Sequence, residues 1–315
     1  MRGKSIIIGI VAVVTAAVGG VIGPAPAEAA TATFPQAKSC ADFPAFWRSW
    51  NPMPTKLFAD ETRWVPQGLA YDPSRKWLFV SYYDGRDGVA SSQKYRSMLT
   101  VSTLAGTRIK TIYFHTEDVP RGGHAGGLAV GRGNLYVATT EDKPRVTRIP
   151  LTKIAKAENT ATLPNSPTYT TAAASYASFH RGRLFVGDFE NDRVYRYDTT
   201  SKGAVIKKTR VAYPTPTLVQ GLAVTDDQFV FSRSFGRTRY SYLTVVDRTT
   251  WSQRHSAMPN MSQGITWAPS SATKATSNLY VLFESGSTAY GAGDDDGAAT
   301  CRTHRLYQKP RSEIL

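Results

Sequence analysis

The stretch VPQGLAYD, residues 65–72, returns along the chain as LVQGLAVT (218–225) and MSQGITWA (261–268). A looser copy, HAGGLAVG (124–131), has Gly in place of Gln. In a fifth place, SYASFHRG (175–182) occupies the same position without the dipeptide. Each copy is followed closely by a second apolar run; these runs are WLFVSYYDG (77–85), NLYVATTED (134–142), RLFVGDFEN (183–191), QFVFSRSFG (228–236) and NLYVLFESG (278–286). The chain is therefore an internal repeat, and the repeat decides its fold.

The residue after Gln, or its equivalent, marks the phase of each repeat. The markers are Gly68, Gly127, Tyr176, Gly221 and Gly264, with spacings of 59, 49, 45 and 43 residues. A repeat of this length fits one four-stranded blade of a β-propeller. The outer strands alternate apolar and polar residues, as in RVYRYDTT (193–200), which half-buried antiparallel strands require. The sequence predicts an all-β protein, a five-bladed β-propeller with four-stranded antiparallel blades.

The last repeat lacks one strand, because only THRLYQKP (303–310) has an extended pattern after its second run. The segment PTKLFADE (54–61) precedes the first repeat and is expected to supply this N-terminal strand and close the ring. The only two cysteines, Cys40 and Cys301, lie near the two ends of the mature chain. In an exported protein such a pair is expected to form a disulfide, which would fasten the closure.

Residues 1–29 are expected to be a secretory signal peptide. Arg2 and Lys4 precede an apolar run at 6–22, and Ala27-Glu28-Ala29 fits an A-x-A cleavage signal. No second apolar stretch is long enough to span a membrane, so no membrane association is expected after cleavage. We therefore expect a secreted protein whose residues 30–315 form a single propeller domain, with repeats starting near 64, 121, 172, 217 and 260.

The 315 residues carry a formal net charge of +14. Their basic residues are scattered over strands and turns, as in VIKKTRVAY (205–213), without a block that also offers stacking aromatics. Nucleic acid is therefore not expected as a partner. The charge favours an anionic cell-wall polymer as a partner. The protein is expected to be a monomer.

The ends of the second strands are expected to form a site. In an antiparallel sheet they lie beside the starts of the first strands, so both meet at one mouth of the channel. Their polar residues vary from blade to blade, which favours a pocket for a polar ligand over the alternative, ion pairs between blades. The Gln amides can serve either the blade junctions or the ligand. The expected ligand-binding residues are Gln67, Tyr82, Tyr83, Asp84, His124, Glu141, Asp188, Glu190, Gln220, Arg233, Arg237, Gln263 and Glu284.

Familiar catalytic signatures are absent, namely G-x-S-x-G, H-E-x-x-H, the P-loop and G-x-G-x-x-G. Whether the protein is an enzyme is left open, and the candidate catalytic residues are Asp188, Glu190, Glu284 and His124. No cofactor and no metal site are predicted. The three acids within GAGDDDGAAT (291–300) could attract a calcium ion, but their spacing differs from an EF-hand and favours a solvated insertion.

Arg233 is expected at the same mouth of the channel, and two kinds of partner are considered for its guanidinium. A guanidinium there needs an acidic partner or an anionic ligand to offset its desolvation. It is expected either to receive a carboxylate or phosphate of the ligand, or to pair with Glu190 or Glu284 of a neighbouring blade.

The segments PQGLAYD with LFVSYYDG, HAGGLAV with LYVATT, LFVGDFEN, VQGLAV with VFSRSFGR, and MSQGITW with LYVLFESGS resemble a known family in the same order. It is a largely uncharacterised family of exported β-propeller proteins of Gram-positive bacteria. The resemblance covers about residues 64–290. It implies the propeller fold and secretion, and no established activity.

More distant similarities bear on function. The Gln-Gly-apolar strand is similar to that of the five-bladed plant-type glutaminyl cyclases, which use an acid after the second strand of the first blade. Tyr82-Tyr83-Asp84 stands at that place. Five-bladed arabinan-degrading glycosidases use three carboxylates around the axis, an arrangement that Asp84, Asp188 and Glu284 could imitate.

The expected function is the binding of a polar, anionic or glycan-type extracellular ligand at the channel mouth. One alternative is a hydrolase or lyase that acts on extracellular polysaccharide through the rim carboxylates. A second alternative is acyl transfer of the glutaminyl cyclase type.

Overall fold

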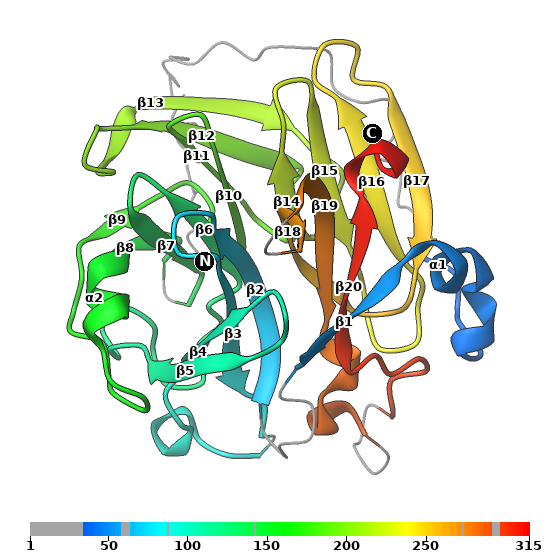
Figure 1. The fold of residues 1–315 in the computed structure, drawn as a ribbon, viewed down its shortest axis with the longest axis horizontal. Coiled ribbons are helices and arrows are strands. Elements are labelled where there is room, and N and C mark those ends of the chain that lie inside the picture. Colours follow the sequence, from blue (N-terminus) through cyan, green and yellow to red (C-terminus); the bar gives the residue numbers. More distant parts are fainter. Residues whose placement is uncertain (1–33, 58–63, 87, 142, 272–273, 292–296) are drawn as a thin grey trace, which may run out of the picture.

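The protein was analysed as a computed structural model, which describes residues 34–57, 64–86, 88–141, 143–271, 274–291 and 297–315. In this part of the chain, five four-stranded sheets are arranged around a central axis (Figure 1). The expected five-bladed propeller is confirmed. The expected signal peptide, residues 1–29, lies outside the described residues. Among the described residues no helix is long and apolar enough to cross a membrane.

Each of the first four blades is built from four consecutive antiparallel strands. Blade 1 contains β2 (Trp64–Asp72), β3 (Trp77–Asp84), β4 (Met98–Thr103) and β5 (Arg108–Tyr113). Blade 2 contains β6 (Gly127–Gly131), β7 (Asn134–Thr139), β8 (Arg145–Pro150) and β9 (Thr168–Thr170), with the short helix α2 (Leu151–Lys156) between its last two strands. Blade 3 contains β10 (Tyr176–His180), β11 (Arg183–Gly187), β12 (Arg193–Thr199) and β13 (Val205–Pro214). Blade 4 contains β14 (Val219–Val224), β15 (Gln228–Arg233), β16 (Ser241–Asp247) and β17 (Gln253–Met258).

Blade 5 is assembled from both ends of the described chain. Its strands are β18 (Ser262–Ser271), β19 (Lys274–Phe283), β20 (Arg305–Pro310) and, outermost, β1 (Asn51–Lys56). Strand β1 pairs antiparallel with β20, so an N-terminal strand closes the ring as expected, although it lies at 51–56 rather than at 54–61. The expected disulfide is confirmed: Cys40, just before helix α1 (Pro44–Ser49), is bonded to Cys301, just before β20.

The glycine of the Gln-Gly step is explained by the crowded axis. The five innermost strands lie close together there, and a Cβ atom on Gly264 would lie 2.6 Å from the backbone nitrogen of Leu69 and 2.7 Å from the carbonyl oxygen of Gln67. Only a residue without a side chain lets the strands of blades 5 and 1 approach so closely. The hydrophobic core fills the spaces between neighbouring blades, as where Phe79 of blade 1 packs with Val137 of blade 2.

Candidate functional site

A cavity of about 490 Å³ opens at the channel mouth, and two positions of the repeat supply most of its lining. The residue before the phase marker lines the cavity in all five blades; these residues are Gln67, Gly126, Ser175, Gln220 and Gln263. The second position lies at the end of the second strand or just after it and contributes Tyr83, Thr140, Phe189 and Glu284. Blade 4 differs at the second position: its residue there, Ser234, is buried and does not line the cavity. We call this space the axial cavity.

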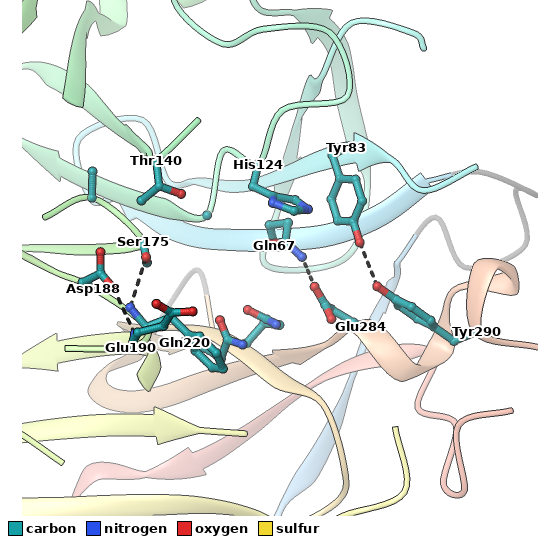
Figure 2. Close-up of a pocket in the computed structure, with 14 residues that line it drawn as sticks. Gln67, Tyr83, His124, Thr140, Ser175, Asp188, Glu190, Gln220, Glu284 and Tyr290 are labelled. Atoms are coloured by element: carbon teal, nitrogen blue, oxygen red, sulfur yellow. Dashed lines mark hydrogen bonds between the residues drawn. The ribbon is translucent and has the colours of Figure 1, made fainter. Parts of the chain in front are cut away.

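Glu284 is the buried carboxyl group of the axial cavity. It is only 8% exposed and begins the 3-10 turn Glu284–Gly286, the first of two such turns after β19. Its Oε1 accepts a hydrogen bond from Nε2 of Gln67 (Figure 2), and the side chain of Gln263 is also hydrogen-bonded to it. Burial raises the pKa of Glu284 to about 8, although Gln263 and the charge of Arg237 act in the opposite direction. The carboxyl group is therefore mostly protonated at neutral pH.

The turn that carries Glu284 is held from two sides. The Ser287 hydroxyl donates a hydrogen bond of 2.8 Å to the carbonyl oxygen of Trp64 in blade 1. Nη2 of Arg302 donates to the carbonyl oxygens of Gly286 and Ser287, at 3.1 and 3.0 Å. Arg302 directly follows the disulfide-bonded Cys301, so the ring closure also fixes the position of Glu284.

Two phenol groups meet beside Glu284. The hydroxyl oxygens of Tyr83 and Tyr290 lie 2.7 Å apart (Figure 2), and the guanidinium of Arg237 lies 4.8 Å from the ring centre of Tyr290. Burial raises the pKa of Tyr290 well above its usual value, and the proximity of Glu284 and Tyr83 adds to this effect. Tyr290 therefore stays neutral and can donate a hydrogen bond.

His124 lines the same wall. Its ring lies edge-on to the ring of Tyr83, with the centres 4.2 Å apart, and Nδ1 lies 3.6 Å from Oε1 of Glu141. Its side chain is 52% exposed and belongs to the lining of the axial cavity. The surrounding protein, helped by the charge of Lys94 and opposed by Glu141, lowers the pKa of His124. The imidazole is therefore neutral at neutral pH.

Two carboxyl groups of blade 3 lie on another side of the axial cavity, apart from Gln67 and Glu284 (Figure 2). The backbone N–H of Glu190 donates a hydrogen bond of 2.9 Å to Oδ1 of Asp188, which fixes the turn after β11. The N–H of Phe189 donates one of 3.1 Å to the hydroxyl of Ser175. The cavity thus places a protonated acid and two further carboxyl groups around one space.

Most of the residues expected from the sequence meet in this cavity. Those that line it are Gln67, Tyr83, His124, Asp188, Glu190, Gln220, Gln263 and Glu284. Tyr82 and Arg233 do not, because both lie within their strands, β3 and β15, and their side chains point to the other face of the blade. Asp188 stands at the same position of its repeat but follows the end of β11, and it lines the cavity. Tyr82 is packed in the core. Nε of Arg233 donates a hydrogen bond of 2.9 Å to the carbonyl oxygen of Thr217, and its guanidinium lies over Phe34.

Three other expected residues support the cavity from outside its lining. Asp84 is fully buried and paired with Arg86 at 2.7 Å; burial alone would raise its pKa, but hydrogen bonds from Arg86 and the N–H of Tyr95 lower it. Of the three carboxylates expected around the axis, Asp188 and Glu284 therefore line the cavity, whereas Asp84 does not. Glu141 accepts hydrogen bonds from the N–H of His124 and the hydroxyl of Thr139, and Arg237 lies behind Tyr290.

Sequence reasoning missed several residues of the lining. Thr140, Phe189, Gly126 and Ser175 stand at the two cavity-lining positions of their repeats, so an alignment of the five repeats would have found them. Tyr290 follows the last repeat and has no equivalent, so no repeat signal marks it. Within the described residues no group of three or more His, Cys, Asp and Glu could hold a metal ion. The acids considered for calcium, residues 294–296, lie outside the described part of the chain.

No family model matches this chain, and a search of curated proteins gives no match. Among solved structures, it is similar to a GH43_1 enzyme from Xanthomonas citri, with 12% identity, a TM-score of 0.49, and coverage of 84% of this chain and 92% of that one. It is also similar to the PQQ-bound aldose sugar dehydrogenase of Streptomyces coelicolor, with 12% identity, a TM-score of 0.48 and coverage of 82% and 97%. It is also similar to hydrazine synthase of Kuenenia stuttgartiensis, with 11% identity, a TM-score of 0.38, and coverage of 71% of this chain and 64% of that one. The chain therefore spans less than two thirds of that protein. At these identities the similarities concern the fold alone, and the resemblance to an exported bacterial family stays a prediction.

Proposed function

We propose that the axial cavity binds an uncharged ligand rich in hydroxyl groups, such as a saccharide. The observation that carries this proposal is the polar lining of the cavity. Its amides, phenols and protonated carboxyl group offer hydrogen bonds without positive charge, and no Lys or Arg is among the described residues that line it. A hydroxyl group both donates and accepts, and so do the side chains of Gln67, Gln220 and Gln263.

The size and the rings of the cavity support the same ligand class. A volume of about 490 Å³ falls in the usual range for small-molecule sites. The rings of Tyr83, Phe189 and Tyr290 supply apolar area beside the polar groups. An anionic ligand is less suitable, because Asp188 and Glu190 would repel it and the described lining contains no cation to compensate.

Titration calorimetry with matched sugars tests this proposal. A neutral hexose or N-acetylhexosamine oligomer is expected to bind, and the corresponding uronate is expected to bind more weakly. Gln220→Ala should lower the affinity about fivefold, the cost of about one hydrogen bond, whereas the matched control Gln253→Ala on the outer strand β17 should leave it unchanged. Preference for the uronate would contradict the proposal.

The protonation of Glu284 favours a second candidate function, the hydrolysis of a glycosidic bond. Glu284 would give its proton to the leaving oxygen as the bond from the anomeric carbon breaks, while Asp188 or Glu190 attacks that carbon or activates water. One water molecule is consumed in total. Acyl transfer of the glutaminyl cyclase type has less support, because Tyr83, not an acid, occupies the cavity-lining position of blade 1.

Incubation of the pure protein with wall polysaccharides, followed by mass analysis of the products, tests this second function. Glu284→Gln should abolish turnover and retain binding, because the amide keeps the shape but cannot donate a proton to the leaving group. Glu313→Gln, at an exposed site near the C-terminus, is the matched control and should retain full turnover. Turnover that survives in Glu284→Gln would exclude Glu284 as the acid.

A further inference from the structure

A second polar hollow lies on the outer side of the ring, between blades 2 and 3. It has a volume of about 430 Å³, and we call it the outer cleft. Among the described residues that line it, three side chains are cations and none is an acid. These residues are Thr170, Thr171, Ala172, Tyr197, Lys207, Lys208 and Arg210. All three cations come from the segment VIKKTRVAY (205–213).

An irregularity of strand β13 gathers these cations. The strand pairs Arg196–Val211 and Asp198–Ile206 flank it, and between them the single residue Tyr197 of β12 faces four residues of β13, 207–210. In a regular strand, the adjacent Lys207 and Lys208 would point to opposite faces of the sheet. A bulge interrupts this alternation and redirects side chains, so that both lysines and Arg210 line one cleft.

The bulge is held by a specific side chain. The hydroxyl of Thr209 accepts a hydrogen bond of 2.8 Å from the N–H of Asp198 and donates one of 2.8 Å to the carbonyl oxygen of Ile206. On the floor of the cleft, the hydroxyl oxygen of Tyr197 accepts a bond of 2.9 Å from the N–H of Ala172. Its own proton therefore remains available to a ligand.

The acid next to Tyr197 is engaged by another cation. Asp198 is paired with Arg183 at 3.3 Å. Lysines on an outermost strand often serve to prevent pairing with other chains. That role needs neither a bulge nor a cleft, so it does not explain why three cations share one hollow.

We propose that the outer cleft binds a linear polyanion whose tetrahedral oxyanion groups, phosphate or sulfate, repeat along the chain. Three cations within one cleft can take up successive groups of such a polymer, and the net charge of +14 attracts it from a distance. This inference does not depend on the axial cavity or on its proposed ligand.

The test is a titration of the full protein with linear polyphosphate, with poly(glycerol phosphate) and with a sulfated polysaccharide, each at several salt concentrations. The variant Lys207→Gln/Lys208→Gln/Arg210→Gln should lose about tenfold in affinity, and the slope of log affinity against log salt should fall by about 2 to 3. The matched control Lys38→Gln/Arg48→Gln/Lys156→Gln removes the same charge from exposed sites elsewhere and should lose less than about threefold. The polymer with the highest affinity identifies which oxyanion the cleft prefers.

A variant of unchanged charge separates the cleft from general electrostatic attraction. Thr209→Val removes both hydrogen bonds of the bulge and should lower the affinity about threefold, with far-ultraviolet circular dichroism unchanged. Equal losses in the triple variant and its control would overturn the proposal, as would unchanged binding in Thr209→Val or the absence of binding to all three polymers.

Discussion

The axial cavity and the outer cleft differ in charge and in the way the sequence builds them. The axial cavity has three carboxyl groups and no cation in its described lining, whereas the outer cleft has three cations and no acid. Corresponding positions in all five blades contribute to the cavity, while a bulge in a single blade makes the cleft. The repeat thus creates a shared space at the axis, and a local departure from the repeat creates a site of its own.

The two regions also differ in hydration, which predicts different responses to solution conditions. Glu284 is buried, and a buried acid lowers its free energy by keeping its proton. Lys207 and Lys208 are exposed to solvent. We therefore expect binding at the axial cavity to depend on pH, and binding at the outer cleft to depend on salt, which screens exposed charges most strongly.

The largest effect should come from removing the disulfide. Cys40→Ser/Cys301→Ser opens a loop closed over 261 residues, and the loss of this restraint should lower the free energy of unfolding by about 5 kcal/mol at most. Because Arg302 follows Cys301 and holds the turn of Glu284, saccharide affinity should also fall, while polyanion affinity should not. Urea denaturation and the two titrations check this, and equal weakening at both sites would break the comparison.

A pH dependence of stability should follow from Glu284. The pKa of Glu284 has the ordinary glutamate value of 4.5 in the unfolded chain and is about 8 in the folded protein. Between these two pH values the folded protein therefore holds a proton that the unfolded chain has lost. The contribution of Glu284 is fully present below about pH 4.5 and is lost at about 1.4 kcal/mol per pH unit as the pH rises toward 8. Glu284→Gln should lack this decline, which denaturation at a series of pH values measures. The control Glu313→Gln should decline like the wild type, and a decline of the same size in Glu284→Gln would assign it to another group.

A smaller effect is expected from Gly264→Ala. The added Cβ would press on the backbone of Leu69 and Gln67, so we expect a loss of about 1–3 kcal/mol in stability, as for other overpacked sites. Because Gln67 and Gln263 adjoin this contact, saccharide affinity should fall as well. Gly133→Ala, in an open turn with a positive φ of 72°, should cost about 1 kcal/mol and leave binding at the cavity unchanged. Equal affinity in the two variants would show that axial packing does not position the amides.

The smallest expected effect is the coupling between the two regions. Glu284→Gln and the triple substitution of Lys207, Lys208 and Arg210 share no contacts, so their effects on stability should add to within about 0.5 kcal/mol. A double-mutant cycle measures this term. A larger coupling would mean that the cavity and the cleft are not independent.

The fold could be predicted from the sequence because the repeat records it five times. The apolar runs marked the inner strands, and the cysteines marked the closure. The closing strand was placed a few residues too late, at 54–61 instead of 51–56, because it stands outside the repeat and has no second copy for comparison.

The site was predictable only in part, for a related reason. The repeat showed which strand ends meet, but side-chain direction changes with every residue along a strand. Tyr82 and Tyr83 are adjacent in sequence, yet one is packed in the core and the other lines the cavity. The outer cleft could not be predicted, since the bulge of β13 depends on hydrogen bonds of Thr209 that leave no periodic pattern.

The measurement that tests the account most directly is the titration of Glu284 itself. Carboxyl carbon signals of protein labelled with 13C-glutamate, assigned by comparison with Glu284→Gln, give the pH at which this group ionises. The account predicts a midpoint of about 8, so that the axial cavity contains a protonated acid at neutral pH. A midpoint near 4.5, the ordinary value for a glutamate, would contradict it.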